Sequence, residues 1–167
     1  MKNLISIIII LFLTLSIMTP YAQAANSDVT PVQAARIYSG IATGSTVPRL
    51  QLIKQIDKQV KNQSAPDIYN LDQRFLKIVK KGLEFCVEKG TGQAAKLENI
   101  KIAGKTGSAE VHSTGKTHGW FASYAPAENP EIVVVVIAEK AGHGGSIAAP
   151  IAKKIFEGYF INTLAKE

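Results

Sequence analysis

Two segments of the chain combine lysine, threonine and glycine, a composition suited to holding an anion. The first is Lys105–Ser108 (KTGS) and the second is Gly115–Thr117 (GKT). A phosphate-binding loop requires a further glycine five residues before the glycine of its Gly-Lys-Thr. Those positions hold Asn99 for the first segment and Glu110 for the second, so neither segment is expected to bind a nucleotide.

The first segment has the composition of a strand edge that binds an extended peptide. Alternation along a strand places Lys105 and Gly107 on one side and Thr106 and Ser108 on the other. Gly107 lets another backbone lie close to the strand, and Lys105 supplies positive charge. The two hydroxyls can donate to a carboxylate, and the N–H of Ser108 can point at a developing oxyanion. The segment predicts a site for a peptide that ends in a carboxylate, with an ordinary exposed strand end as the alternative.

The second segment is richer in turn-forming residues. Residues Ser113–Gly119 (STGKTHG) lie between two strand patterns and predict a hairpin loop. They contain the one Ser-x-x-Lys spacing of the chain, from Ser113 to Lys116. A serine that a lysine activates needs a rigid helix start with the base one turn away, so Ser113 is not expected to be a nucleophile.

The remaining reactive side chains indicate neither a metal site nor a cofactor. Cys86 is the one cysteine, and its place in an apolar helical pattern predicts a small buried side chain. His112, His118 and His143 show no metal-ligand spacing with Cys86 or with acidic residues. Lysines are scattered and no aromatic residues alternate with them, so the net charge of +6 does not indicate nucleic-acid binding.

Helices are expected on both sides of a set of strands. The first helix is predicted from Thr30 to Gly44, since Pro31 suits a first turn and Gly44 a stop. An extended strand or arm over Leu50–Ile56 and a loop over Lys58–Asp67 follow. The later helices are predicted over Leu71–Glu88 and Pro150–Thr163.

Apolar spacing predicts which faces of the two later helices are buried. We expect the buried side chains of one to be Phe75, Ile78, Val79 and Cys86, opposite exposed Arg74, Lys77, Lys80 and Lys81. We expect those of the other to be Ile151, Ile155, Phe156, Tyr159 and Phe160.

Three strand patterns lie between these helices, at Ile100–Val111, Trp120–Tyr124 and Ile132–Ala138. The last is apolar without a break, which predicts a strand covered on both faces. His143–Ser146 reads as a flexible connection to the last helix. The predicted fold class is α/β of the α+β type, with an antiparallel sheet of three or four strands flanked by helices.

The N-terminus predicts export. One lysine precedes about fifteen apolar residues, Leu4–Met18, and Ala22-Gln23-Ala24 follows, so residues 1–24 are expected to be a signal peptide or an uncleaved membrane anchor. The expected location is therefore the periplasm or the outer face of the cytoplasmic membrane. Residues 28–163 are expected to form one domain, which reaches the membrane only through the N-terminal segment.

Four stretches resemble the transpeptidase domain of penicillin-binding proteins, most nearly the class B, elongation-type branch. Three are similar to its C-terminal portion: IAGKTGSAEV, HGWFASYAPAENPEIVVVVIAEK and AAPIAKKIFEGYF. The stretch VTPVQAARIYSGIATGSTVPRLQLIKQI resembles the helix and arm before that portion. The resemblance covers about Asp28 to Tyr159 and implies a partial penicillin-binding fold.

The resemblance also implies roles for the first segment. Penicillin-recognising enzymes carry Ser-x-x-Lys, Ser-x-Asn and Lys-Thr-Gly, in that order. By resemblance, Lys105 sets the positive potential, while Thr106 and Ser108 hold the carboxylate of a peptidoglycan stem peptide or of a β-lactam. Gly107 completes the motif, and the Ser108 N–H forms one arm of the oxyanion hole.

The first two family motifs have no counterpart before Lys105, and Ser-x-Asn occurs nowhere in the chain. No catalytic nucleophile is therefore expected, and the chain alone is expected to be inactive. The family sheet also has two further strands beside the one matching Ile132–Ala138, so that edge is expected to be bare. The open interpretations are a truncated gene product, a non-catalytic module that binds wall peptides or a cell-wall partner protein, and a subunit that completes an active site with a separately encoded N-terminal half.

Overall fold

The computed structural model describes residues 29–49, 55–56, 59–60, 65–111 and 114–164. The predicted signal or anchor over residues 1–24 lies outside them, as does Ser113. The chain divides into two units after Thr30, and the description that follows concerns the second unit. Among the described helices, none combines the length and the apolar character that crossing a bilayer requires.

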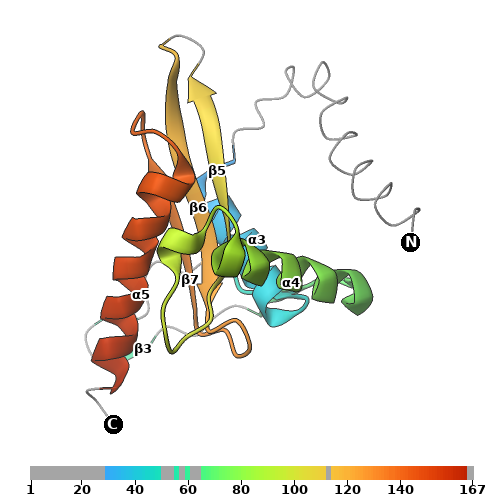
Figure 1. Ribbon diagram of the computed structural model, residues 1–167. Coiled ribbons are helices and arrows are strands. Elements are labelled where there is room, and N and C mark those ends of the chain that lie inside the picture. The colour runs from blue at the N-terminus through green and yellow to red at the C-terminus, as the bar shows by residue number, and fades with distance from the viewer. Residues whose placement is uncertain (1–28, 50–54, 57–58, 61–64, 112–113, 165–167) are drawn as a thin grey trace, which may run out of the picture. The chain divides into compact units, whose positions relative to one another are not determined.

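The centre of this unit is a three-stranded antiparallel sheet (Figure 1). Its strands are β5 (Ala103–Val111), β6 (Lys116–Ala125) and β7 (Ile132–Ala138), in the spatial order β5-β6-β7. The three predicted strands are therefore present. However, β6 begins at Lys116, because the ladder with β5 continues to the pair Val111 and Lys116, so half of the predicted hairpin loop is strand.

Helix α5 (Ala149–Leu164) covers one face of the sheet and runs along the strands (Figure 1). Ala152, Phe156 and Phe160 recur every four residues on α5 and pack against the sheet, where Phe121 and Val136 belong to the same buried cluster. The prediction that Ile151, Ile155 and Tyr159 are buried is wrong, since all three are exposed. Each lies one residue before a buried position and thus about 100° around the helix.

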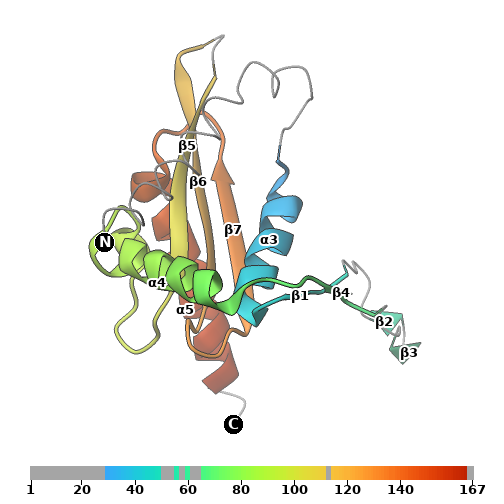
Figure 2. The ribbon, with the colours of Figure 1, turned by 90° about the vertical axis from the view of Figure 1, so that its right-hand side faces the viewer.

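Helices α3 (Pro31–Thr43) and α4 (Gln73–Lys89) pack on the opposite face, and α4 lies across the strands (Figure 2). Their contact is a second cluster around Tyr124, which includes Ala42 and Leu83. On β7, Val134 and Val136 of the α5 face are buried, but the residues of the opposite face are only partly buried. The predicted full cover of β7 on both faces is therefore not observed.

Helix α4 begins after Asp72, whose side chain accepts a hydrogen bond of 2.9 Å from the Arg74 N–H. Its buried residues are Leu76, Leu83 and Val87. Lys80 also turns inward and donates to the carbonyl of Ala42 at 2.8 Å. The predicted burial of Phe75, Ile78 and Val79 is wrong, as is the predicted exposure of Lys80, because the helix packs through the neighbouring apolar arc.

Four two-residue strands connect α3 to α4. Strand β1 (Thr46–Val47) pairs with β4 (Asp67–Ile68), and β2 (Gln55–Ile56) pairs with β3 (Gln59–Val60). Strand β2 agrees with the predicted arm, whereas β3 and the start of β4 replace part of the predicted loop. The carboxylate of Asp67 holds the β1–β4 pair in place, since it accepts from Arg36 at 2.9 Å and from Arg49 at 3.3 Å.

The hydroxyl of Tyr124 is buried and has no hydrogen-bond partner among the described residues. Burial raises the pKa of Tyr124 to about 12, and burial together with the nearby Cys86 raises the pKa of Tyr38 to about 12. These values lie above the ordinary tyrosine pKa of 10.0, so the two residues favour folding below about pH 10. That stability is lost as the pH rises from about 10 to about 12.

We expect Tyr124→Phe to raise the free energy of unfolding at pH 7 by about 1 kcal/mol, because it removes an unsatisfied buried donor. It should also lessen the loss of stability above pH 10, with Tyr38 still titrating. Urea unfolding from pH 7 to 12 measures both effects, and Tyr69→Phe at an exposed site is the matched control. A loss of stability at pH 7 would show that the hydroxyl has a partner.

Candidate functional site

The predicted site residues lie on β5, which is one end of the described sheet. Lys105 and Ser108 are exposed, and Thr106 and Gly107 are half-buried. Lys105 Nζ donates to the carbonyl of Thr106 at 2.9 Å, which places that carbonyl on the outer edge of the strand. Because peptide groups of alternate residues point the same way, the N–H of Ser108 lies on that edge as well.

The predicted alternation along this strand is present. Lys105 is paired with Ala122 and Gly107 with Trp120, on the face that α3 and α4 cover in part. Thr106 is paired with Phe121 and Ser108 with Gly119, on the face that α5 covers. Lysine and hydroxyl groups therefore flank the same edge from opposite faces.

The loop after α4 reaches the hydroxyl of Thr106. Thr91 Oγ1 lies 2.6 Å from Thr106 Oγ1, and Cys86 Sγ lies 3.6 Å from Thr91 Oγ1. The carbonyl of Cys86 accepts from the N–H groups of both Gly90 and Gly92, which turns the chain so that Thr91 faces β5. Cys86 is half-buried, so the predicted burial of its side chain is observed only in part.

A second element reaches the hydroxyl of Ser108 on the same face of the sheet. His143 Nδ1 lies 3.3 Å from Ser108 Oγ, just before the π-helical turn η2 (Gly144–Ala148). A Cβ added to Gly144 would collide with the Trp120 carbonyl and lie 2.5 Å from the Gly107 carbonyl. The backbone at Gly144 thus packs directly on the ladder. The segment predicted as a flexible connection is an ordered turn that supports the site.

Sequence reasoning missed Thr91 and His143 as neighbours of the site. Each is far from its partner along the chain, by 15 residues for Thr91 and 35 for His143. The available signals were the glycines beside them, Gly90, Gly92 and Gly144, which mark places of close backbone approach.

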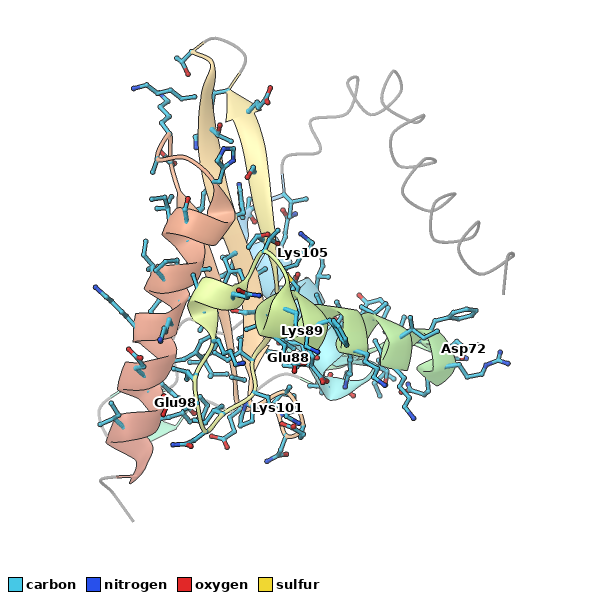
Figure 3. The ribbon with its side chains drawn as sticks, viewed as in Figure 1. Asp72, Glu88, Lys89, Glu98, Lys101 and Lys105 are labelled. Atoms are coloured by element: carbon cyan, nitrogen blue, oxygen red, sulfur yellow. The ribbon has the colours of Figure 1, made fainter. Side chains whose placement is uncertain are left out.

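Within the described residues, no carboxylate forms an ion pair with Lys105. Lys101 lies four residues before Lys105. It differs from Lys105 because it forms an ion pair with Glu128 at 2.8 Å, which raises the pKa of Lys101. Figure 3 shows Lys105 near the end of α4 that carries Glu88 and Lys89, whereas Lys101 precedes β5 and lies lower in this view, near the level of Glu98. The cationic group at this edge is therefore available to an anion from outside the chain.

The described part of the chain brings no serine hydroxyl into hydrogen-bond contact with a lysine ammonium. The hydroxyl of Ser123 is buried and donates to the Val134 carbonyl at 3.0 Å, and that of Ser146 donates to the His143 carbonyl at 3.2 Å. A serine nucleophile would need a base within hydrogen-bond distance of its hydroxyl. The arrangement can bind an anion and present an N–H, but it contains no serine–lysine pair for acyl transfer.

A separate cavity of about 370 Å³ lies between α4 and the segment before β5. None of the four site residues lines it, and its walls contain no serine, cysteine or histidine. It therefore offers no nucleophile for acyl chemistry. Its lining residues are Glu84, Val87, Glu88, Lys96, Leu97, Glu98, Ile100, Lys101 and Ile102.

Comparison with known families agrees with the resemblance described above. Residues 14–157 match the family described as "Penicillin binding protein transpeptidase domain". The chain is 33% identical over 155 residues to the peptidoglycan D,D-transpeptidase MrdA of Haemophilus influenzae, covering 80% of this chain and 24% of that protein. It is also 33% identical over 141 residues to the peptidoglycan D,D-transpeptidase FtsI of Buchnera aphidicola.

Solved structures give the same result. PBP2 of Pseudomonas aeruginosa superposes with a TM-score of 0.66 at 33% identity, over 78% of this chain and 30% of PBP2. The D,D-transpeptidase domain from Eggerthella lenta superposes with a TM-score of 0.70 over 81% of this chain and 33% of that domain. At 24% identity, this second match supports the fold alone. The chain thus spans about a quarter to a third of these relatives, and the predicted partial transpeptidase fold is confirmed.

Proposed function

The chain belongs to the penicillin-binding protein transpeptidase family, and on that premise we propose that Lys105–Ser108 is the substrate-binding strand of a peptidoglycan D,D-transpeptidase site. The substrate is the carboxylate end of a stem peptide, and a β-lactam occupies the same edge. The observation that carries this proposal is the exposed Lys105, without an ion-pair partner among the described residues, on an end strand that also presents two hydroxyls.

Each residue has a defined part in this proposal. Lys105 provides the positive potential that attracts the carboxylate, and Thr106 and Ser108 donate hydroxyl protons to it. Thr91 and His143 hold those two hydroxyls in place when no ligand is bound. The outward N–H of Ser108 donates to the oxygen that gains charge during acyl transfer, and Gly107 leaves room for the ligand backbone.

In this proposal the chain binds substrate but does not become acylated. The Ser-x-x-Lys and Ser-x-Asn motifs that precede Lys-Thr-Gly in the family are missing before Lys105. One oxyanion donor contributes about 3 kcal/mol to catalysis when the nucleophile is present, and it cannot replace that nucleophile. Acyl transfer therefore requires a nucleophilic serine that the residues before Lys105 do not supply.

Two measurements on the purified full chain test the proposal. Fluorescent penicillin is expected to leave no covalent label on a denaturing gel. Isothermal titration with a stem peptide ending in D-Ala-D-Ala is expected to show reversible binding. Lys105→Ala should weaken that binding about tenfold, since it removes one charge-assisted interaction.

Lys116→Ala is the matched control, because it removes an exposed lysine of the other Gly-Lys-Thr and should leave the affinity unchanged. Covalent labelling of the wild-type chain would contradict the missing nucleophile. Equal losses of affinity in both variants would show that the peptide responds to general charge rather than to the β5 edge.

A further inference from the structure

Trp120 is the one tryptophan of the chain, and it lies beside the proposed binding edge. The strand register pairs it with Gly107 on β5 and with Ile137 on β7. Trp120 is only half-buried, and it belongs to neither of the two buried clusters. The indole is therefore a large aromatic group that remains partly accessible next to the strand that carries Lys105.

Gly107 lacks the side chain that would otherwise stand between Trp120 and the outer edge of β5. A Cβ added to Gly107 would lie 3.2 Å from Trp120 Cβ and 3.9 Å from Trp120 Cγ. Apart from its chain neighbours, it would meet no other described atom within 4 Å. The residues that flank Gly107 on this face of the strand are Lys105 and Ala109. The space over Gly107 is thus one residue wide, and Trp120 forms its inner wall.

A peptide that adds to β5 presents a side chain to this space in either register. Side chains of an extended peptide alternate between the two faces of a sheet, so one of its last two residues points to the face of Trp120. An added strand lies about 5 Å outside β5 and hence about 10 Å from β6. Because Gly107 leaves the way between them open, an indole and a ligand side chain can meet across that distance.

We infer that Trp120 is a specificity-determining residue of the proposed site, whose indole packs on a small apolar side chain in one of the last two residues of the bound peptide. The inference rests on the proposed function and adds a residue to it. A methyl group gains free energy by leaving water against the indole, whereas glycine offers no such group. A charged side chain would lose hydration there without gaining a partner.

The single tryptophan makes this contact measurable in the purified wild-type chain. Tryptophan fluorescence reports Trp120 alone, and acrylamide quenches it in proportion to the access that the indole leaves to solvent. A saturating peptide ending in D-Ala-D-Ala should lower the quenching constant about twofold, because a bound side chain covers one side of the ring. An unchanged quenching constant with the peptide bound would overturn the inference.

Two further peptides, ending in D-Ala-Gly and in Gly-D-Ala, locate the contact by isothermal titration. One of them should bind about fourfold more weakly than D-Ala-D-Ala, because it lacks the methyl group that meets the indole. Trp120→Thr should abolish that difference and Trp120→Phe should retain it. Ile137→Thr is the matched control and should also retain it, because Ile137 lies on the same face at the same level but one strand farther from the edge.

The outcomes separate this inference from the proposed function. Absence of binding of any peptide to the wild-type chain would overturn both. Binding that Lys105→Ala weakens, but with the same discrimination among the three peptides in Trp120→Thr as in wild type, would overturn the role of Trp120 and leave the proposed function intact. Circular dichroism establishes that each variant is folded. If Trp120→Thr does not fold, the quenching measurement on the wild-type chain decides alone.

Discussion

Replacing Phe156 with alanine is expected to lower the free energy of unfolding by about 3–5 kcal/mol. The ring is fully buried at the centre of the α5 stripe, in one cluster with Phe121, Val134 and Ala152. Removing it leaves a cavity that surrounding alanines are too short to fill. Because small domains have total stabilities of about 5–15 kcal/mol, urea denaturation of the variant should show a large fall in the midpoint.

The neighbouring residue provides the control for this prediction. Ile155 is 43% exposed, and Ile155→Ala should cost less than about 1 kcal/mol. Equal losses for the two variants would mean that α5 packs through a different face. Because Phe156 belongs to both the predicted and the observed stripe, the measurement on Ile155 decides between them.

Gly144→Ala is expected to cost up to about 3 kcal/mol, because the added methyl group would overlap backbone atoms that cannot move aside. Those atoms are the carbonyl oxygens of Trp120 and Gly107, which belong to the central ladder. Relief requires η2 to shift away from β5, so His143 should lose its contact with Ser108. Thermal unfolding measures the loss, and the ring signals of His143 in a ¹H–¹⁵N spectrum report the displacement.

Gly158→Ala tests whether this effect belongs to the site rather than to glycine replacement in general. A Cβ at Gly158 meets no atom within 4 Å, and alanine is the better residue in a helix interior, so a gain of up to about 1 kcal/mol is expected. An unchanged melting temperature for Gly144→Ala would show that η2 has room to adjust.

Local patterns predicted the sheet and its edge well. Alternating and unbroken apolar segments identified all three strands, and the two-residue period correctly separated Lys105 and Gly107 from Thr106 and Ser108. These features depend on neighbouring residues, which is why one sequence sufficed. The resemblance then supplied the roles of the four residues, which the strand pattern alone does not contain.

The errors concern contacts that form across long distances. Helix α4 has apolar residues over more than half of its circumference, so the choice between burying Leu76 and burying Ile78 depends on the sheet it meets. Strands β1 and β3 have only two residues each, too few for a periodic signal. The approach of Thr91 and His143 to the site was hidden because only the folded backbone brings them there.

The contacts among Cys86, Thr91 and Thr106 set the direction in which hydrogen bonds are donated at the proposed site. A hydroxyl has a single proton to donate, so when Thr106 gives its proton to a bound carboxylate it can only accept from Thr91. Thr91 then has no proton left for the sulfur and accepts from the thiol of Cys86, 3.6 Å away. Binding of an anion would thereby orient the protons of Thr106, Thr91 and Cys86 in the same direction. The hydrogen bonds would couple occupancy of the strand to the last turn of α4.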